Sequence, residues 1–247
     1  MLIHPTVERL RARPHRHGGR AHRAAEQSAG SRDAACRLAR PAHRSRSDLS
    51  RQPPSLAPPG CPAKLRQAAT VEDVDYRTAR GLDRALFQAL TTSQWVREHN
   101  HLAIIGPTGT GKSWLACALG NKACRDGFSV LYKRASRLFA DLAQARGEGR
   151  LPRLMTTLER TNLIIIDDWG PEPLTAEQRR DLLEIVDDRY DKGSLLITSQ
   201  VPIAQWHDII ADPTLGDAIL DRIVHNAHRI QLKGDSLRRR AGEGKKA

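Results

Sequence analysis

The chain has 247 residues and a formal net charge of +12 at pH 7, with 40 Lys and Arg against 28 Asp and Glu. This length fits one large domain, or one domain with an appendage, and the excess of positive charge indicates a polyanionic partner. No apolar run approaches the roughly 20 residues of a membrane-spanning helix, the opening MLIHPTVERL lacks the apolar segment of a secretory signal, and the four Cys form no CxxC pair. We therefore expect a soluble, cytoplasmic protein.

The first quarter of the chain differs in composition from the rest. Residues 1–63 hold 12 Arg and 4 acidic residues, whereas residues 64–247 hold 28 basic and 24 acidic residues. Residues 13–62 are rich in Arg, Ala, Pro, Ser and His, have neither helical nor strand periodicity, and contain two Pro-Pro pairs that would break a helix. We therefore expect residues 1–62 to be basic, of low complexity and disordered.

Three interpretations of residues 13–62 stay open. The segment can be a disordered arm that binds nucleic acid, or a solvated tail. It can also be the product of a frameshift, because GC-rich DNA read out of frame gives text rich in Arg, Ala, Pro and His. Codons for residues 12–21 can be chosen so that a shift of one nucleotide yields a helix-like string, Leu-Gly-Leu-Thr-Ala-Met-Ala-Asp-Ala. In that case a helical N-terminal region has been lost, and the proper frame resumes near residues 63–65.

From residue 63 onward, apolar residues recur with the periods of helices and strands. A first helix is expected over residues 83–98, with a buried face formed by Leu86, Phe87, Leu90 and Trp95. The expected strands are 102–106, 128–134, 162–167, 194–200 and 229–234. The expected helices between them are 112–127, 136–149, 151–160, 175–193, 203–210 and 217–228. This alternation predicts an α/β domain over residues 63–240, built on a parallel sheet with helices on both faces, and a disordered basic tail at residues 241–247.

The segment GPTGTGKS at residues 106–113 matches the pattern GxxxxGK[ST] in full, between an expected strand and an expected helix. Its glycines let several backbone N–H groups point at one anion, and the N-terminus of the helix adds partial positive charge. Lys112 can reach the β- and γ-phosphates of a nucleotide, and the hydroxyl of Ser113 can bind Mg²⁺, a hard cation. The expected ATP-binding residues are Gly106, Pro107, Thr108, Gly109, Thr110, Gly111, Lys112, Ser113 and Trp114.

Two aspartates follow the apolar run at residues 163–166. A buried carboxylate is unfavourable unless a cation compensates its charge, and in folds with this phosphate loop an acid at the end of a second buried strand binds the Mg²⁺ shell. We therefore expect Asp167 and Ser113 to form the Mg²⁺ site. Asp168 is expected to be the general base that orients or activates the attacking water, and the alternative is a simple loop carboxylate or helix cap.

Three more polar residues are candidates for the same chemistry. Ser199 and Gln200 end an expected strand, where they can position the water or contact the γ-phosphate, or simply face solvent. Arg222 lies on the helix that follows, and its spacing favours an ion pair with Asp221 or Asp217. A cation that stabilises the charge of the transition state can also come from a neighbouring subunit, which is the second role open to Arg222.

A basic band surrounds the second expected strand and the helices after it. Its members are Arg134, Arg137, Arg146, Arg150 and Arg153. The band is either an ordinary solvated surface or a surface that follows the phosphates of DNA.

Four segments together resemble one family: GPTGTGKSWLACALG, LIIIDDWGPEPL, LLITSQVPIAQWHDIIADP and AILDRIVHNAHRIQLKGDSLR. In this order they look like the IstB-like ATP-binding proteins, the transposition helpers of certain insertion sequences, which are relatives of the DnaC helicase loaders within the AAA+ ATPases. The resemblance covers residues 63–240. It implies an AAA+ P-loop domain with strand order 5-1-4-3-2, ATP hydrolysis, ATP-dependent assembly of several copies on double-stranded DNA, and cooperation with a partner transposase in selecting a target site.

The resemblance also implies roles for single residues, matched motif by motif. Lys112 and Ser113 would bind ATP and Mg²⁺, Asp167 and Asp168 would be the acidic pair, and Ser199 and Gln200 would be at the sensor position. Arg222 would reach the nucleotide of a neighbouring subunit.

The chain departs from the family pattern at three places. Gln200 stands where many relatives have Asn, and Asp168 stands where many AAA+ relatives have Glu. The shorter side chain of Asp168 predicts slow hydrolysis, because a shift of about 1 Å can reduce a rate by about 10²-fold. Residues 13–62 do not match the helical N-terminal region of the family. Two other functions stay open, a helicase loader and a non-hydrolysing DNA scaffold or defective remnant.

Overall fold

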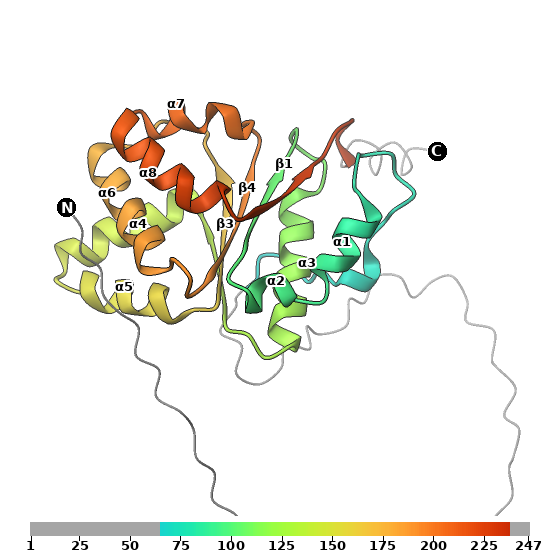
Figure 1. The fold of residues 1–247 in the computed structure, drawn as a ribbon, viewed down its shortest axis with the longest axis horizontal. Helices are drawn as coiled ribbons and strands as arrows, with labels where there is room; N and C mark the ends of the chain where they lie inside the picture. The colour runs from blue at the N-terminus through green and yellow to red at the C-terminus, as the bar shows by residue number, and fades with distance from the viewer. Residues whose placement is uncertain (1–64, 238–247) are drawn as a thin grey trace, which may run out of the picture. The chain divides into compact units, whose positions relative to one another are not determined.

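A computed structural model describes residues 65–237, and the interpretations of residues 1–62 and 241–247 lie outside this range. Within it, five parallel strands form one sheet in the order β2-β3-β4-β1-β5, which is the predicted order 5-1-4-3-2 read from the other edge (Figure 1). The strands are β1 (His101–Ile105), β2 (Val130–Arg134), β3 (Leu163–Trp169), β4 (Ser194–Ser199) and β5 (Ala227–Gln231). The predicted fold class is confirmed.

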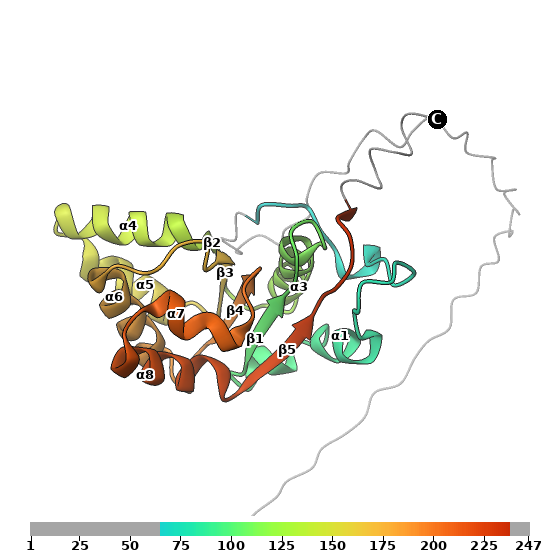
Figure 2. The same cartoon turned by 90° about the horizontal axis from the view of Figure 1, so that it is seen from above.

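Helices cover both faces of the sheet, as the two views in Figures 1 and 2 show. One face carries α1 (Arg84–Leu90), α2 (Gln94–Arg97) and α3 (Lys112–Arg125). The other face carries α4 (Ala135–Gly147), α5 (Leu151–Arg160), α6 (Ala176–Asp188), α7 (Trp206–Ile210) and α8 (Pro213–Val224). Two short 3-10 turns, η1 (Val71–Asp73) and η2 (Ile203–Gln205), complete the described elements. None of the helices within residues 65–237 has the length and apolar character to cross a membrane.

The apolar runs of the central strands are explained by burial on both faces. In β1, Leu102 and Ile104 pack into the cluster that includes α1 and α3, whereas Ala103 and Ile105 pack into the cluster on the other face. All five residues of β1 are buried. Such a strand reads as a continuous apolar run rather than an alternating one, as expected for a parallel sheet between two helical layers.

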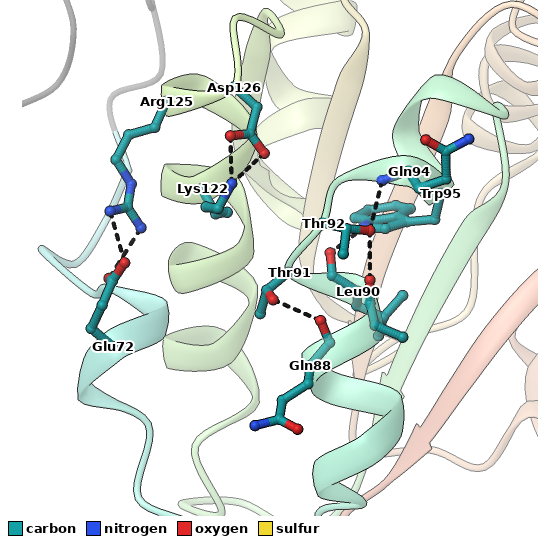
Figure 3. Close-up of polar contacts among 11 residues, drawn as sticks. Glu72, Gln88, Leu90, Thr91, Thr92, Gln94, Trp95, Lys122, Arg125 and Asp126 are labelled. Atoms are coloured by element: carbon teal, nitrogen blue, oxygen red, sulfur yellow. Dashed lines mark hydrogen bonds and ion pairs between the residues drawn. The ribbon is translucent and has the colours of Figure 1, made fainter.

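The structure has two helices, α1 and α2, where the sequence predicts a single helix over residues 83–98. The prediction of one continuous helix was wrong. The hydroxyls of Thr91 and Thr92 donate to carbonyls in the last turn of α1, at 2.7 and 2.8 Å, and thereby satisfy the free end of the helix (Figure 3). Ser93 has a φ of 56°, which turns the chain into α2. The indole of Trp95 donates to a third carbonyl of α1 at 3.0 Å and fixes the corner.

Other element ends differ from the prediction for local reasons. The last helix begins at Pro213 rather than near residue 217, because the Asp212 carboxylate accepts a hydrogen bond from the backbone N–H of Leu215 at 3.0 Å and proline suits a first helical turn. The helix expected from residue 175 begins at Ala176, because Thr175 caps it and Gln178 completes a capping box with Thr175.

The segment that precedes α1 is held against α3. Arg125, in the last turn of α3, forms an ion pair with Glu72 of η1 at 2.9 Å (Figure 3). The same η1 turn packs along α3, and Val74 and Tyr76 contribute to the core beneath it. The ion pair holds η1 beside the last turn of α3, whereas Arg66 and Arg80, on either side of η1, line the cavity at the other end of that helix.

Arg189 is a buried charge that has no role in the predicted chemistry. It is 1% exposed, and its two terminal nitrogens donate to four backbone carbonyls at 2.5 to 3.2 Å. These carbonyls belong to Leu158, Thr161, Asn162 and Ser194, at the end of α5 and the starts of β3 and β4. Burial lowers the pKa of Arg189 to about 10, so the guanidinium remains charged at neutral pH.

We predict that Arg189→Met lowers the free energy of unfolding by about 2–4 kcal/mol, because buried carbonyls lose their donor. Arg180→Met is the matched control, since Arg180 is exposed on α6, the helix that ends just before Arg189, and it should change the value by less than about 0.5 kcal/mol. Urea unfolding of both variants measures the difference. Equal stability of the two variants would contradict this structural role.

Candidate active site

The carboxyl ends of the central strands and the N-terminus of α3 surround a cavity of about 520 Å³. Six of the nine predicted loop residues line it: Thr108, Gly109, Gly111, Lys112, Ser113 and Trp114. Asp167 and Asp168 line it from the end of β3, and Gln200 lines it from the turn after β4. Ligands of open α/β sheets bind at this edge, so the position agrees with the predicted nucleotide site.

The other three loop residues, Gly106, Pro107 and Thr110, stabilise the conformation of the loop through hydrogen bonds. The Nζ atom of Lys112 donates to the carbonyls of Gly106 and Pro107, at 2.6 and 2.8 Å. The hydroxyl of Thr110, which is fully buried, donates to the same Pro107 carbonyl at 2.9 Å. The loop therefore curls around the ammonium group of Lys112, which lies at the start of α3 where an anion is favoured.

Two glycines of the loop have a conformation and a packing that require glycine. Gly109 has a φ of +85° and Gly111 a φ of +94°. A side chain at Gly111 would meet the guanidinium of Arg80 at 2.8 Å, and one at Gly109 would overlap Ser236. The backbone N–H of Leu237 also donates to the carbonyl of Gly109 at 2.9 Å. Segments far apart in the sequence thus enclose the loop on two sides.

Asp167 is fully buried, and all the groups around it donate to it. Its Oδ1 accepts hydrogen bonds from the hydroxyls of Ser113 and Thr198, each at 2.6 Å. Its Oδ2 accepts one from the phenol of Tyr132 at 2.6 Å, and the guanidinium of Arg66 is 3.7 Å from it. These donors satisfy the buried carboxylate and hold it beside Ser113, as the sequence predicts.

Tyr132 remains a donor in this arrangement. Burial, together with its hydrogen bond to Asp167, raises the pKa of Tyr132 above its ordinary value. The phenol therefore keeps its proton at neutral pH and remains available to donate to Asp167.

Asp168 leaves the sheet through a β-bulge. Ile166 pairs with Ile197, but the next pair is Trp169 with Ser199, so β3 contains one residue more than β4 over this interval. Asp168 adopts a φ of 63°, and its backbone N–H donates to the hydroxyl of Thr198 at 3.0 Å. The bulge turns the exposed carboxylate of Asp168 into the cavity, whereas its neighbours stay buried.

Trp169 anchors the far side of the bulge. It is 3% exposed and packs against Trp206, with the ring centroids 6.0 Å apart. The carbonyl of Trp169 accepts a hydrogen bond from the hydroxyl of Ser199 at 2.8 Å. The same hydroxyl accepts from the N–H of Val201 at 3.0 Å. Ser199 therefore supports the bulge and the following turn, and it is not among the residues that line the cavity. Its contact with the nucleotide stays a prediction.

Gln200 lines the cavity and contacts Asp168 directly. The Nε2 atom of Gln200 donates to Asp168 Oδ1 at 3.3 Å. Its Oε1 accepts a hydrogen bond from the hydroxyl of Thr108 at 2.5 Å. The two side chains at which the sequence departs from the family pattern, at positions 168 and 200, are thus in contact.

Arg222 lies on α8, outside the lining of the cavity. Its Nε forms an ion pair with Asp187 of α6, and its Nη1 donates to the carbonyl of Ala218 at 2.9 Å. The expected partners Asp221 and Asp217 were wrong; Asp217 instead lies 3.0 Å from the Nε2 of His207. The reason is tertiary, since α6 packs along α8 and brings Asp187 to Arg222.

Sequence reasoning did not single out Arg66, Arg80 and Thr198, which line the cavity. It also did not single out Tyr132, which donates to Asp167. Thr198 was the easiest of these residues to find from the sequence. It lies one residue before the Ser-Gln pair, and the alternation of a strand places its side chain on the face opposite to that of Ser199. Arg80 is buried and donates to the carbonyls of Thr110 and Asp75, at 3.3 and 3.0 Å. Nothing in the local sequence of Arg66, Arg80 or Tyr132 indicates that they approach the loop.

The basic band is largely neutralised by neighbouring carboxylates. Arg137 pairs with Asp141, Arg146 pairs with Glu177 and Asp181, and Arg150 pairs with Glu148. Arg134 lines the cavity. These contacts favour the interpretation of the band as ordinary structural and surface charge.

Comparison with known proteins identifies the family. The family model described as IstB-like ATP binding protein matches residues 20–244. The chain belongs to this family. It is 63% identical to the putative insertion sequence ATP-binding protein y4pL of Sinorhizobium fredii. The alignment spans 177 residues, or 72% of each chain. It is 51% identical to y4uH of the same organism. That alignment spans 177 residues, or 72% of this chain and 71% of the relative.

The solved structures agree with the fold. The crystal structure of the DnaC helicase loader has a TM-score of 0.53 at 20% identity, over 60% of this chain and 87% of that chain. At this identity the likeness shows the fold alone, which is that of a DnaC-like AAA+ domain. ATP binding is supported by the family to which the chain belongs.

We predict that Thr198→Val lowers the free energy of unfolding by about 1–3 kcal/mol, because the buried N–H of the bulge and the Asp167 carboxylate both lose a partner. Thr198→Ser keeps the hydroxyl and should lose about 1 kcal/mol or less, through the missing methyl group. Denaturant unfolding compares the two. A valine variant as stable as the serine variant would show that the hydroxyl does not bridge the two aspartates.

Proposed function

We propose that the chain hydrolyses ATP to ADP and phosphate at this site, that it assembles in several copies on double-stranded DNA when ATP is bound, and that it assists a partner transposase in selecting a target in the cytoplasm. The observation that carries the proposal is the convergence of Lys112, Ser113, Asp167 and Asp168 on one cavity. The four residues come from the phosphate loop and from the end of a neighbouring strand.

The phosphate chain of ATP would lie over the N-terminus of α3. The backbone N–H groups of the loop and the ammonium of Lys112 would bind it, since a phosphate oxygen is a stronger acceptor than the two loop carbonyls that Lys112 contacts in the structure. The two segments that hold Arg80 and Leu237 would enclose the rest of the nucleotide, because both residues line the same cavity.

The site fits a Mg²⁺ ion. Ser113 Oγ and Asp167 Oδ1 are 2.6 Å apart, and both are hard oxygen atoms of the kind that Mg²⁺ prefers. When bound, Mg²⁺ would supply charge neutralisation at the β- and γ-phosphates. Ser113 and Asp167 would hold it, and the hydroxyls of Tyr132 and Thr198 would keep Asp167 oriented toward Ser113.

Asp168 would act on the attacking water. Its carboxylate is exposed to the cavity and adjacent to Gln200, so it can accept a proton as the water oxygen bonds to the γ-phosphorus and the bond to the ADP oxygen breaks. The short side chain keeps the carboxylate close to the backbone of β3, and for this reason we propose slow turnover in the absence of DNA.

The DNA and transposase partners are supported by charge and by relatives. The net charge of +12 favours a polyanion, and the relatives y4pL and y4uH are named as proteins of insertion sequences. A helicase loader receives less support, because the likeness to DnaC shows the fold alone.

We predict that Asp168→Asn reduces DNA-stimulated phosphate release by about 10²-fold and leaves ATP affinity within about threefold, because the base is lost and the phosphate loop is retained. Lys112→Ala is the comparison, and it should weaken ATP binding by at least about tenfold. Phosphate release and fluorescent-nucleotide titration measure the two quantities. Unchanged release by Asp168→Asn would favour a scaffold that does not hydrolyse ATP.

We predict that Arg222→Ala binds ATP normally but loses about 10³-fold in DNA-stimulated hydrolysis, because the cation that it supplies to a neighbouring subunit is missing. A mixture of Arg222→Ala with Asp168→Asn should recover activity, since interfaces form in which the intact site of one subunit receives the arginine of the other. Failure of the mixture to recover activity, under conditions where both variants assemble on duplex DNA, would place Arg222 in a purely structural ion pair with Asp187.

A further inference from the structure

Two hydrogen bonds connect the phosphate loop to Asp168 through the amide of Gln200. The hydroxyl of Thr108 donates to Gln200 Oε1 at 2.5 Å, and Gln200 Nε2 donates to Asp168 Oδ1 at 3.3 Å. The three residues lie on different segments, namely the loop after β1, the turn after β4 and the bulge of β3, and all three line the cavity. We call this arrangement the Thr108–Gln200–Asp168 link.

The amide of Gln200 can serve this link in only one orientation. A carboxylate accepts hydrogen bonds but donates none, so the NH₂ group of the amide must face Asp168 and the oxygen must face Thr108. The hydroxyl of Thr108 can donate to that oxygen, which stabilises the same orientation from the other end. Without the hydroxyl, the amide oxygen loses its donor and the amide can rotate away from Asp168.

The backbones on both sides of the amide are fixed independently. The N–H of Asp168 is held by Thr198, and the bulge is held by the hydrogen bond from Ser199 to the carbonyl of Trp169. The hydroxyl of Ser199 also accepts from the N–H of Val201, which fixes the turn that carries Gln200. The remaining freedom of the Asp168 carboxylate is in its side-chain torsions, and the amide of Gln200 acts on these.

We propose that Thr108 is a positioning residue for the general base: it orients the amide of Gln200, which in turn orients the carboxylate of Asp168. Because Thr108 belongs to the loop that binds phosphates, the direction of the base depends on the conformation of that loop. The inference rests on the proposed hydrolysis of ATP, and it adds to it a connection between nucleotide binding and the base.

The first test compares Thr108→Val, which is similar in volume and lacks the hydroxyl, with Thr108→Ser, which keeps it. In single-turnover hydrolysis on duplex DNA, the valine variant should be about tenfold slower and the serine variant within about twofold of the unaltered protein. The Kd for a fluorescent ATP analogue should stay within about twofold for both, since backbone N–H groups of the loop bind the phosphates. Equal losses for the two variants, or a loss in Kd that matches the loss in rate, would overturn the proposal.

The second test shows whether Thr108 acts through Gln200. In a Gln200→Ala background, Thr108→Val should cause no further loss of rate, because the amide that it orients is absent. The same loss in both backgrounds would overturn the proposal and assign Thr108 a role in the loop itself.

A third measurement needs no turnover and separates this inference from the proposed function. The charge of Asp168 acts most strongly on the γ-phosphate, which ADP lacks, so the ratio of ATP to ADP affinity reports the position of that charge. Thr108→Val should change this ratio by about twofold, the limit given above for the ATP Kd, in the protein that retains Asp168, and leave it unchanged in an Asp168→Asn background. If the unaltered protein binds ATP and releases no phosphate, the proposed hydrolysis fails while this measurement still decides the link. A ratio that Thr108→Val changes equally in both backgrounds, or in neither, would overturn it.

Discussion

The buried carboxylate of Asp167 is the constraint on which the site depends. A negative charge at the end of an apolar strand is unfavourable unless donors surround it, and three hydroxyls and a guanidinium supply that environment. The donors come from the start of α3, from β2, from β4 and from the segment before η1. The donors to this one carboxylate therefore join the phosphate loop, three strands and the N-terminal part of the described chain at a single point. A cation bound at this point would replace some of these donors.

The second aspartate depends on the first. Thr198 donates to Asp167 and accepts from the backbone of Asp168, so one hydroxyl fixes both the buried acid and the bulge that exposes the next. Trp169 completes the bulge by returning the chain to the core against Trp206. Two adjacent residues of the same type thus have opposite environments, one fully buried and one open to the cavity. In the proposed function, this separation would let the first hold a cation and the second accept a proton.

Much of this arrangement could be predicted from the sequence, because it follows from local patterns. The parallel sheet follows from continuous apolar runs, the phosphate loop from GPTGTGKS, and the pair of Asp167 with Ser113 from the position of an acid at the end of a strand. The bulge could not be predicted, since a one-residue register shift depends on the pairing of β3 with β4. Thr198, which the sequence did not single out, lines the cavity, and Ser199 is not among the lining residues. The approach of Arg66, Arg80 and Tyr132 depends on tertiary packing over long separations, as does the pairing of Arg222 with Asp187.

The central claim is that Ser113 and Asp167 form the cation end of an ATP site. It is tested most directly by measuring ATP affinity with Mg²⁺ and with EDTA, in the unaltered protein and in Ser113→Ala. The account predicts that Mg²⁺ tightens ATP binding by at least about tenfold in the unaltered protein, and that most of this gain is lost in Ser113→Ala, because one oxygen ligand of the ion is missing. Affinity that is equal in Mg²⁺ and EDTA, or a gain that Ser113→Ala leaves intact, would contradict it.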